Sequence, residues 1–226
     1  MDLDLSGAVH RLIAGPTGSG KSYFVGALVE GLRKEERPFI VLDTKTRNHA
    51  GLISLPGVVR VVIRPGKRYN WDRLVKYPYV LVVPSSRMMI QDLIALYTDL
   101  LDRIYAAGEE RIIIVEEAHN FNKNAYSPSP ILELISREGR GRGICLWFLT
   151  QRIQDFPKLL WSQCYWSYLL KFLIPQDIRY AEALIPHFTD INRDLSRHDV
   201  LCYDHITGVH NIIKAHDVTR SSKHLG

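Results

Sequence analysis

The sequence predicts a three-layer α/β domain, in which a central and mostly parallel β-sheet lies between two layers of helices. Short apolar runs rich in Val, Ile and Leu recur along most of the 226 residues, and helical patterns separate many of them. Such continuous runs are typical of strands buried on both faces, as in parallel sheets. Strands that alternate with helices place helices on both sides of the sheet.

The predicted elements follow one another in a regular order. The strand-like runs are residues 9–14, 39–43, 58–63, 80–83, 111–115, 144–150 and 165–173. The helical patterns are residues 21–34, 88–107, 131–137 and 176–184. Residues 199–204 and 210–217, joined through "HITG", predict a C-terminal β-hairpin at the sheet edge. No Pro/Gly/Ser-rich linker interrupts the series, so we expect one domain over residues 1–218 and a disordered tail over 219–226.

Composition places the chain among ordinary globular proteins, with 46% hydrophobic and 23% charged residues. The net charge of +5 mildly favours a polyanionic partner. Cys145, Cys164 and Cys202 have no metal-ligand spacing, and we expect them to be reduced and mostly buried. The first ten residues lack the apolar core of a secretory signal, and no apolar run is long enough to span a membrane.

A phosphate-binding motif follows the first predicted strand and opens the first predicted helix. Residues 15–22 read "GPTGSGKS" and match the pattern G-x-x-x-x-G-K-[ST]. Backbone N–H groups of such a loop converge on phosphate oxygens, because glycine places no Cβ in the way, and the helix N-terminus adds its positive end. We expect Lys21 to contact the β- and γ-phosphates and Ser22 to join the shell of a Mg²⁺ ion. The residues predicted to bind the nucleotide are Gly15, Pro16, Thr17, Gly18, Ser19, Gly20, Lys21 and Ser22.

Two neighbouring enzyme classes fit this motif less well than an ATPase. Residues 122–125 ("NKNA") lack the aspartate of the N-K-x-D motif that recognises guanine. This absence disfavours a GTPase switch but does not decide which nucleotide base is bound. Kinases for small substrates usually carry an arginine-rich lid, and none is obvious in the sequence.

Two adjacent carboxylates follow the fifth predicted strand, in "RIIIVEEAH" (residues 111–119). In open α/β sheets, ligands bind at the edge where the strands end. Phosphoryl transfer requires an acid near the metal and a group that orients or deprotonates the attacking water. We therefore predict that Glu116 holds Mg²⁺, directly or through water, and that Glu117 acts on the nucleophilic water. Aspartate is usual at the first position, and the alternative is that both carboxylates are solvated loop charges.

A third informative stretch, residues 136–157, reads "SREGRGRGICLWFLTQRIQDFP". Its buried strand ends at Gln151, where a polar side chain beside the carboxylate strand could hydrogen-bond the γ-phosphate or the water, so we predict a sensor role. Before the strand, "REGRGRG" offers Arg137, Arg140 and Arg142, and its glycines would loosen the helix end, so that one of these arginines could reach outward. These arginines could equally cap the helix C-terminus, where cations are favoured.

Together, "GPTGSGKS", "IIIVEEAH" and "SREGRGRGICLWFLTQR" resemble the HerA/FtsK superfamily of DNA-pumping P-loop ATPases. The later "LLKFLIPQDIRYAEALI" is similar to the segment after the sensor strand in HerA-like proteins, and the resemblance runs from about Val9 to Asp204. The third block is the specific part, and Glu116 in place of aspartate is the departure. The resemblance implies a RecA-like P-loop fold of the ASCE type, hydrolysis of ATP with Mg²⁺, and Arg140 as the arginine supplied in trans, since it matches the family's "REGR" block.

The resemblance also implies partners and a role. Such motors form rings, usually hexameric, with ATP between subunits and double-stranded DNA in the centre. In size and motifs the chain looks like the genome-packaging ATPases of tailless, membrane-containing double-stranded DNA viruses, which implies a place in the host cytoplasm or the virion and contact with a capsid vertex or inner-membrane component. The alternatives are a HerA-like repair, conjugation or phage-assembly translocase, or a non-motor ATP-binding module. Residues 43–51 and 64–71 are basic clusters that are candidates for DNA contact.

Overall fold

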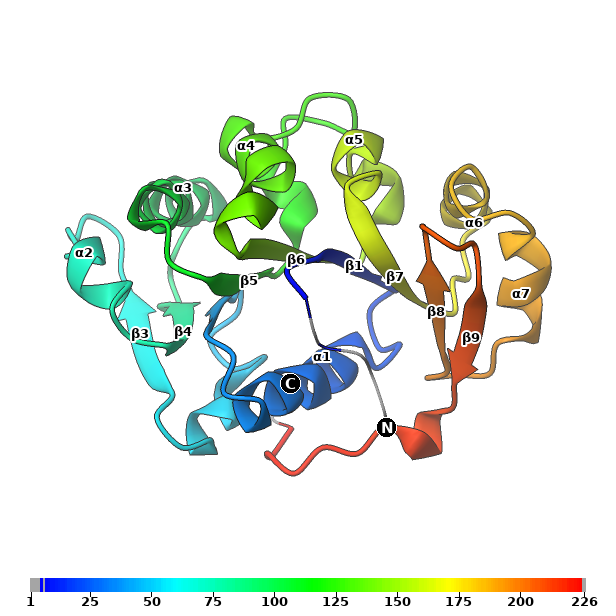
Figure 1. Ribbon diagram of the computed structural model, residues 1–226, viewed down its shortest axis with the longest axis horizontal. Coiled ribbons are helices and arrows are strands. Elements are labelled where there is room, and N and C mark those ends of the chain that lie inside the picture. Colours follow the sequence, from blue (N-terminus) through cyan, green and yellow to red (C-terminus); the bar gives the residue numbers. More distant parts are fainter. Residues whose placement is uncertain (1–4, 6, 225–226) are drawn as a thin grey trace.

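The computed structural model describes residue 5 and residues 7–224, which form a nine-stranded sheet with helices on both faces (Figure 1). The strands are β1 (His10–Ala14), β2 (Phe39–Leu42), β3 (Val59–Ile63), β4 (Tyr79–Pro84), β5 (Arg111–Val115), β6 (Ile144–Thr150), β7 (Cys164–Leu170), β8 (Val200–Asp204) and β9 (His210–Ile213). The α-helices are α1 (Lys21–Lys34), α2 (Trp71–Leu74), α3 (Ile90–Ala107), α4 (Pro130–Glu138), α5 (Lys158–Trp161), α6 (Pro175–Glu182) and α7 (Phe188–Asp194). Among the described helices, none combines the length and the apolar character needed to cross a bilayer.

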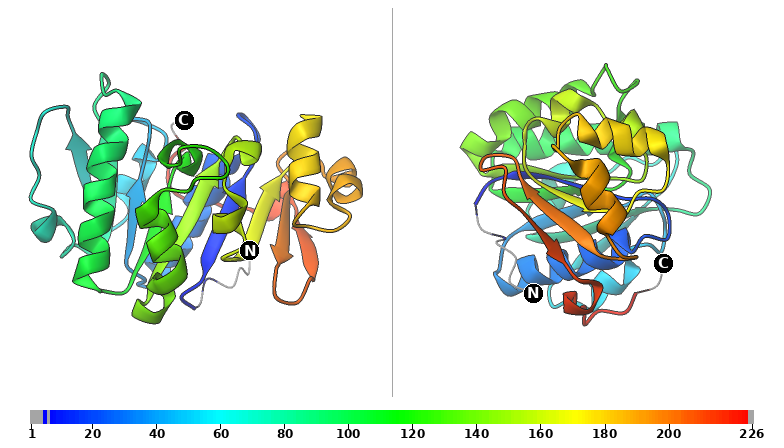
Figure 2. Two further views of the ribbon diagram at one scale, coloured as in Figure 1. Left: turned by 90° about the horizontal axis from the view of Figure 1, so that it is seen from above. Right: turned by 90° about the vertical axis from the view of Figure 1, so that its right-hand side faces the viewer.

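The sheet order is β3-β4-β2-β5-β6-β1-β7-β8-β9. Strands β3 to β7 in this order are parallel, and β8 and β9 form an antiparallel hairpin at the edge. Strand β6 lies between β1, which leads into the phosphate loop, and β5, which leads into the carboxylate pair. The predicted fold class and edge hairpin are confirmed. Figure 2 shows the same sheet from two further sides.

The inner strands of the sheet are buried on both faces, which explains why they are mostly apolar. Leu12 and Ala14 of β1 face one core, together with α3 and α4, whereas Ile13 faces the other core beneath α1. Strand β2 alternates in the same way, with Ile40 on the first face and Val41 on the second. Because the inner strands are buried on both faces, polar side chains concentrate just beyond the strand ends, where the site lies.

The second half of the chain differs from the sequence prediction at β7, at α7 and at the short helix α5. Strand β7 ends at Leu170 rather than at residue 173, and neither α5 nor α7 was anticipated. The side chain of Asn192 in α7 accepts a hydrogen bond from the backbone N–H of Phe172 at 2.8 Å and donates to its carbonyl at 3.1 Å. This tertiary contact supports a short polar helix that its own sequence pattern does not indicate.

The described part of the predicted tail, residues 219–224, packs against α1 instead of standing clear of the domain. Glu30 of α1 accepts hydrogen bonds from the backbone N–H groups of Ser221 and Ser222, at 2.8 and 2.6 Å. A buried carboxylate that is bonded in this way holds the segment in place, whereas composition alone suggested disorder. Residues 225–226 of that prediction lie outside the described residues.

Candidate nucleotide site

The phosphate loop joins β1 to α1 at the edge where the parallel strands end. Its glycines are required by geometry, because Gly18 and Gly20 have φ of +77° and +96°, in the left-handed region that favours glycine. A Cβ on Gly15 would lie 2.8 Å from the Cβ of Leu170, where there is no room for it. The loop is tied to the neighbouring strand by a hydrogen bond from Gly15 N–H to the carbonyl of Thr150 at 3.2 Å. All eight residues predicted to bind nucleotide therefore lie in one preformed loop and helix start.

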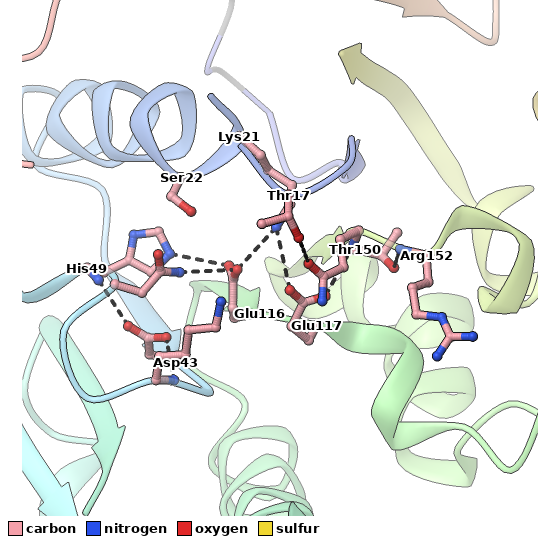
Figure 3. Close-up of polar contacts among 12 residues, drawn as sticks. Thr17, Lys21, Ser22, Asp43, His49, Glu116, Glu117, Thr150 and Arg152 are labelled. Atoms are coloured by element: carbon pink, nitrogen blue, oxygen red, sulfur yellow. Dashed lines mark hydrogen bonds and ion pairs between the residues drawn. The ribbon is translucent and has the colours of Figure 1, made fainter. Parts of the chain in front are cut away.

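Lys21 and the two predicted carboxylates form a buried cluster (Figure 3). The Nζ atom of Lys21 lies 3.1 Å from Oε1 of Glu116 and 4.0 Å from Oε1 of Glu117. Burial lowers the pKa of Lys21, but the charges of the two glutamates outweigh burial and raise it above its ordinary value. The lysine is therefore charged. A phosphate that enters the loop can take the place of a glutamate carboxylate as the anionic partner of Lys21.

The environment separates the pKa values of the two glutamates. Burial would raise the pKa of Glu116, but the charge of Lys21 and the hydrogen bond from His49 hold it well below its usual range. Burial raises the pKa of Glu117, and Lys21 only partly offsets this effect. Pairs of acids whose pKa values are driven apart in this way are typical of a division of roles, with the group of higher pKa suited to proton transfer.

Glu117 also has an unusual backbone. The chain continues the β-ladder through Glu116, whose N–H donates to the carbonyl of Leu42 at 3.0 Å, and then turns sharply at Glu117, where φ is +48°. Left-handed conformations cost energy in residues other than glycine and are concentrated at functional sites. The turn directs the Glu117 side chain toward the end of β6, where its Oε2 accepts a hydrogen bond from Gln151 N–H at 3.2 Å.

Gln151 lies where a sensor residue was predicted, between the phosphate loop and the carboxylates. Its side-chain oxygen accepts a hydrogen bond from the hydroxyl of Thr17, so β6 and the loop are linked by side chains as well as by backbone. His119 adds a second link, because its Nδ1 lies 2.9 Å from Oγ1 of Thr150 and 3.4 Å from Oε2 of Glu117. Burial, and then the charge of Arg152, lowers the pKa of His119 to about 4, so its ring is neutral near pH 7.

The loop after β2 is a fourth segment of the site, and the sequence prediction did not assign it to the site. Residues 43–51 were a candidate DNA contact, yet Nε2 of His49 lies 3.3 Å from Oε2 of Glu116 and Nδ2 of Asn48 donates to its Oε1 at 3.2 Å. The side chain of Asp43 is fully buried and accepts hydrogen bonds from the N–H groups of Lys45 and His49, at 2.9 and 3.0 Å. The available signal was Asp43 itself, a carboxylate directly after a buried strand at the ligand-binding edge.

The donor set of this edge fits Mg²⁺. Glu116 and the hydroxyl-bearing Ser22 both project to the same side of Lys21 (Figure 3). In the part of the chain that the structure describes, no group of three or more His, Cys, Asp or Glu side chains forms a ready-made metal centre. Mg²⁺ is commonly held by one or two carboxylates together with substrate phosphates and water, so a sparse set of oxygen ligands suits it.

Two cavities flank the phosphate loop. The first has a volume of about 290 Å³, and the second, on the other side of the loop, has about 380 Å³. The first is lined by Pro16, Thr17, Gly18, Gly20, Lys21, Ser22, Tyr23, Lys45, Asn48, Glu116, Glu117, Gln151 and His224. The second is lined by Pro16, Thr17, Gly18, Ser19, Lys171, Leu173, Arg197 and His198. The first cavity holds every predicted catalytic side chain except Arg140.

Arg140 lies at the opposite edge of the sheet. It precedes β6, whereas Gln151 follows it, and a seven-residue strand spans roughly 20 Å. Its guanidinium is stacked over the ring of Tyr165, with 4.9 Å between Cζ and the ring centroid, and the residue is exposed. Within one chain, Arg140 is therefore separated from the phosphate loop that it was predicted to serve.

Comparison with known families bears on the site as a whole. Residues 2–136, which include the phosphate loop and both carboxylates, match the family described as the central domain of the helicase HerA. The chain belongs to this family. It is thus a P-loop ATPase of the HerA/FtsK class, as the three sequence blocks predicted.

Solved structures extend the likeness beyond residue 136. The genome packaging NTPase B204 from Sulfolobus turreted icosahedral virus 2, in complex with ATP-gammaS, has a TM-score of 0.75 and 17% identity, and the match covers 92% of this chain and 97% of that one. The DNA-packaging ATPase B204 from Sulfolobus turreted icosahedral virus has a TM-score of 0.72 and 18% identity, over 93% and 98%. VirB4 of Thermoanaerobacter pseudethanolicus has a TM-score of 0.68 and 12% identity, and the match covers 91% of this chain and 88% of that one. At these identities the likeness establishes a common fold; no curated protein sequence matches.

Proposed function

We propose that this HerA-family protein hydrolyses ATP with Mg²⁺ and uses the energy to move double-stranded DNA, in a viral genome-packaging motor. The observation that supports hydrolysis is the buried cluster of Lys21, Glu116 and Glu117, which combines a charged lysine with two acids of separated pKa. A module that only binds ATP has no need for a second acid beside the first.

In the proposed reaction each side chain has a separate task. Lys21 exchanges its ion pair with Glu116 for the β- and γ-phosphates, and Glu117 orients and deprotonates the attacking water. Gln151, held against Thr17 and Glu117, senses the γ-phosphate. Ser22 and Glu116 would hold Mg²⁺, which when bound neutralises charge on the phosphates. We place the nucleoside in the second cavity, which Lys171 and His198 line.

The packaging role is supported by the likeness to the two B204 structures, which covers more than nine-tenths of each chain. The likeness to VirB4 supports the second candidate, a translocase of another DNA-transfer system. For either role we propose a homo-oligomeric ring of six subunits around double-stranded DNA. In the packaging role the ring works in the host cytoplasm or at the virion, with a capsid vertex or inner-membrane component as its partner.

Hydrolysis is tested by phosphate release from wild-type protein and from Lys21→Ala, with Mg²⁺ or with a chelator. We expect the wild type to turn over ATP with Mg²⁺ and the variant to lose nearly all activity, because the charge that holds the β- and γ-phosphates is gone. Equal rates for the two proteins would contradict the proposed site. Linear double-stranded DNA should raise the wild-type rate, and a rate indifferent to DNA would favour a non-motor module.

DNA binding is tested by titration at several salt concentrations. A pump must hold every base pair it passes, so we expect little sequence preference and an affinity that falls about a hundredfold or more between roughly 50 and 200 mM salt. The basic cluster over residues 64–71 is a candidate contact, since Tyr69 and Trp71 stack at 4.9 Å between ring centroids beside Lys67 and Arg68. A strong preference for one short sequence in competition would indicate a site-specific binder instead.

A further inference from the structure

Residues 218–224 cross α1 and reach the mouth of the phosphate cavity, and we call this segment the strap (Figure 1, red, below α1). It is anchored at its start by Val218, which is 8% exposed and packs into the core beneath the sheet. It is anchored again at Glu30, whose carboxylate accepts three hydrogen bonds from Ser221 and Ser222, at 2.6 to 2.8 Å. Burial raises the pKa of Glu30, but these hydrogen bonds outweigh burial and lower it.

The strap contacts the residues that bind phosphate. The Arg220 side chain is buried, and its Nη1 donates to the carbonyl of Ser22 at 3.2 Å, on the first turn of α1. The same Nη1 lies 3.2 Å from Nδ1 of His224. His224 packs edge-on against the ring of Tyr23, with 5.9 Å between centroids, and lines the cavity with Lys21 and Ser22.

Two glycines mark the path of the strap in the sequence. A Cβ on Gly26, in the middle of α1, would lie 2.3 Å from Cζ of Arg220. A Cβ on Gly51, in the 3₁₀ turn that follows His49, would lie 1.8 Å from the carbonyl oxygen of Lys223. Glycine inside a helix costs about 1 kcal/mol relative to alanine, so its presence in α1 calls for a compensating contact. The strap passes so close to both glycines that a larger residue at either position would collide with it.

The hydrogen bond from Arg220 determines what His224 offers to the cavity. Arginine only donates hydrogen bonds, so Nδ1 of His224 must be the acceptor. Nε2 then carries the proton whenever the ring is neutral, and the cavity it lines contains Lys21, Ser22 and Lys45, the surroundings of a polyphosphate.

We propose that the strap is a part of the nucleotide site and that His224 donates a hydrogen bond from Nε2 to a terminal phosphate oxygen of the bound nucleotide. Arg220 and Glu30 are positioning residues, because they act through His224 and the backbone of the strap. The ligand class is a nucleoside polyphosphate: with the nucleoside in the second cavity, as proposed, only the terminal phosphate of such a chain would lie beside His224. This inference rests on the proposed ATPase function and adds a contact that the three sequence blocks do not contain.

The first test compares the affinity for Mg²⁺–AMPPCP and for AMP in wild type, His224→Ala and His216→Ala. His216 is a matched control, because its side chain is 82% exposed and lies in the turn before the strap. We expect His224→Ala to bind AMPPCP about tenfold more weakly, the loss of one hydrogen bond to a charged group, and AMP unchanged. Equal AMPPCP affinity, or an equal loss for AMP, would overturn the inference alone. A wild type that binds neither nucleotide would overturn the proposed function as well.

The second test uses Glu30→Gln, which keeps the size of the side chain and removes its charge. Hydrogen exchange of residues 218–224 should rise, while exchange in the sheet stays as in wild type. AMPPCP affinity should fall to the level of His224→Ala, and the double variant should fall no further, because both changes remove the same contact. Losses that multiply in the double variant, or a strap whose exchange is unaltered, would show that His224 does not act through this anchor.

Discussion

The ionisation of two adjacent glutamates is decided by what each one touches. Glu116 receives hydrogen bonds from Lys21, Asn48 and His49, which favour the charged form, whereas the carboxylate of Glu117 accepts one from a backbone N–H at the end of β6. A carboxylate that must hold a cation gains from a low pKa, and one that must take a proton gains from a higher pKa. The difference supports the predicted division, in which Glu116 serves Mg²⁺ and Glu117 serves the water.

Substitution of the two glutamates should separate these roles. Glu117→Gln should still bind ATP but hydrolyse it roughly 10²–10⁴-fold more slowly, because the general base is lost. Glu116→Gln should instead raise the Mg²⁺ concentration needed for half-maximal turnover. Phosphate release is measured over a magnesium titration for both variants. If the two curves have the same midpoint and the same plateau, the division of roles is wrong.

At the residue scale the sequence pointed to the motif residues but not to the side chains that surround them. Lys21 was expected from the phosphate-loop pattern, and Glu117 and Gln151 were expected from strand-end positions, which converge on one edge of a parallel sheet. His49 could not, because a histidine in the polar string "DTKTRNHAG" looks solvated, whereas it is completely buried and contacts Glu116, which follows a different strand. Nothing in the local pattern signals such a tertiary contact.

At the element scale the strands were more predictable than the connections. Strands β2, β4, β5 and β6 are buried throughout and are nearly continuous apolar runs, whereas the edge strand β3 is partly exposed but still rich in valine. Helix α7 and the strap are held by tertiary contacts, among them the hydrogen bonds at Asn192 and at Glu30, and their compositions are those of loops. Element prediction therefore fails where packing, rather than periodicity, supplies the stabilisation.

The strap gives an element-scale prediction. Gly51→Ala should displace the strap, because the new Cβ would overlap the Lys223 carbonyl, and the free energy of unfolding should fall by about 1–3 kcal/mol. Gly141→Ala is the matched control: no atom lies within 4 Å of its Cβ position, so it should be neutral or slightly stabilising. Urea denaturation measures both. Equal free energies of unfolding for the two variants would mean that the strap can move away from residue 51 without destabilising the domain.

At the scale of the whole molecule, the sheet separates two kinds of residue. The edge where the parallel strands end carries the phosphate loop, the carboxylates and Gln151, and the opposite edge carries Arg140 and Arg142 before β6. Arg140 lies roughly 20 Å from the site of its own chain, so it can act on phosphate only in a neighbouring copy. In a head-to-tail ring, unlike faces of adjacent subunits meet, which is the arrangement that this requires.

Mixing two inactive proteins tests the arrangement directly. Phosphoryl-transfer sites gain about 10³–10⁵ in rate from an arginine supplied across an interface, so Arg140→Ala should be nearly inactive alone, as should Lys21→Ala. In mixed rings, some interfaces pair an intact phosphate loop with an intact arginine, and part of the ATPase activity should return. Arg142→Ala, an exposed neighbour whose guanidinium packs on Tyr105, is the control and should stay active. Full activity of Arg140→Ala alone, or rings that form from the mixture without regaining turnover, would leave this arginine as a helix-end cation that takes no part in hydrolysis.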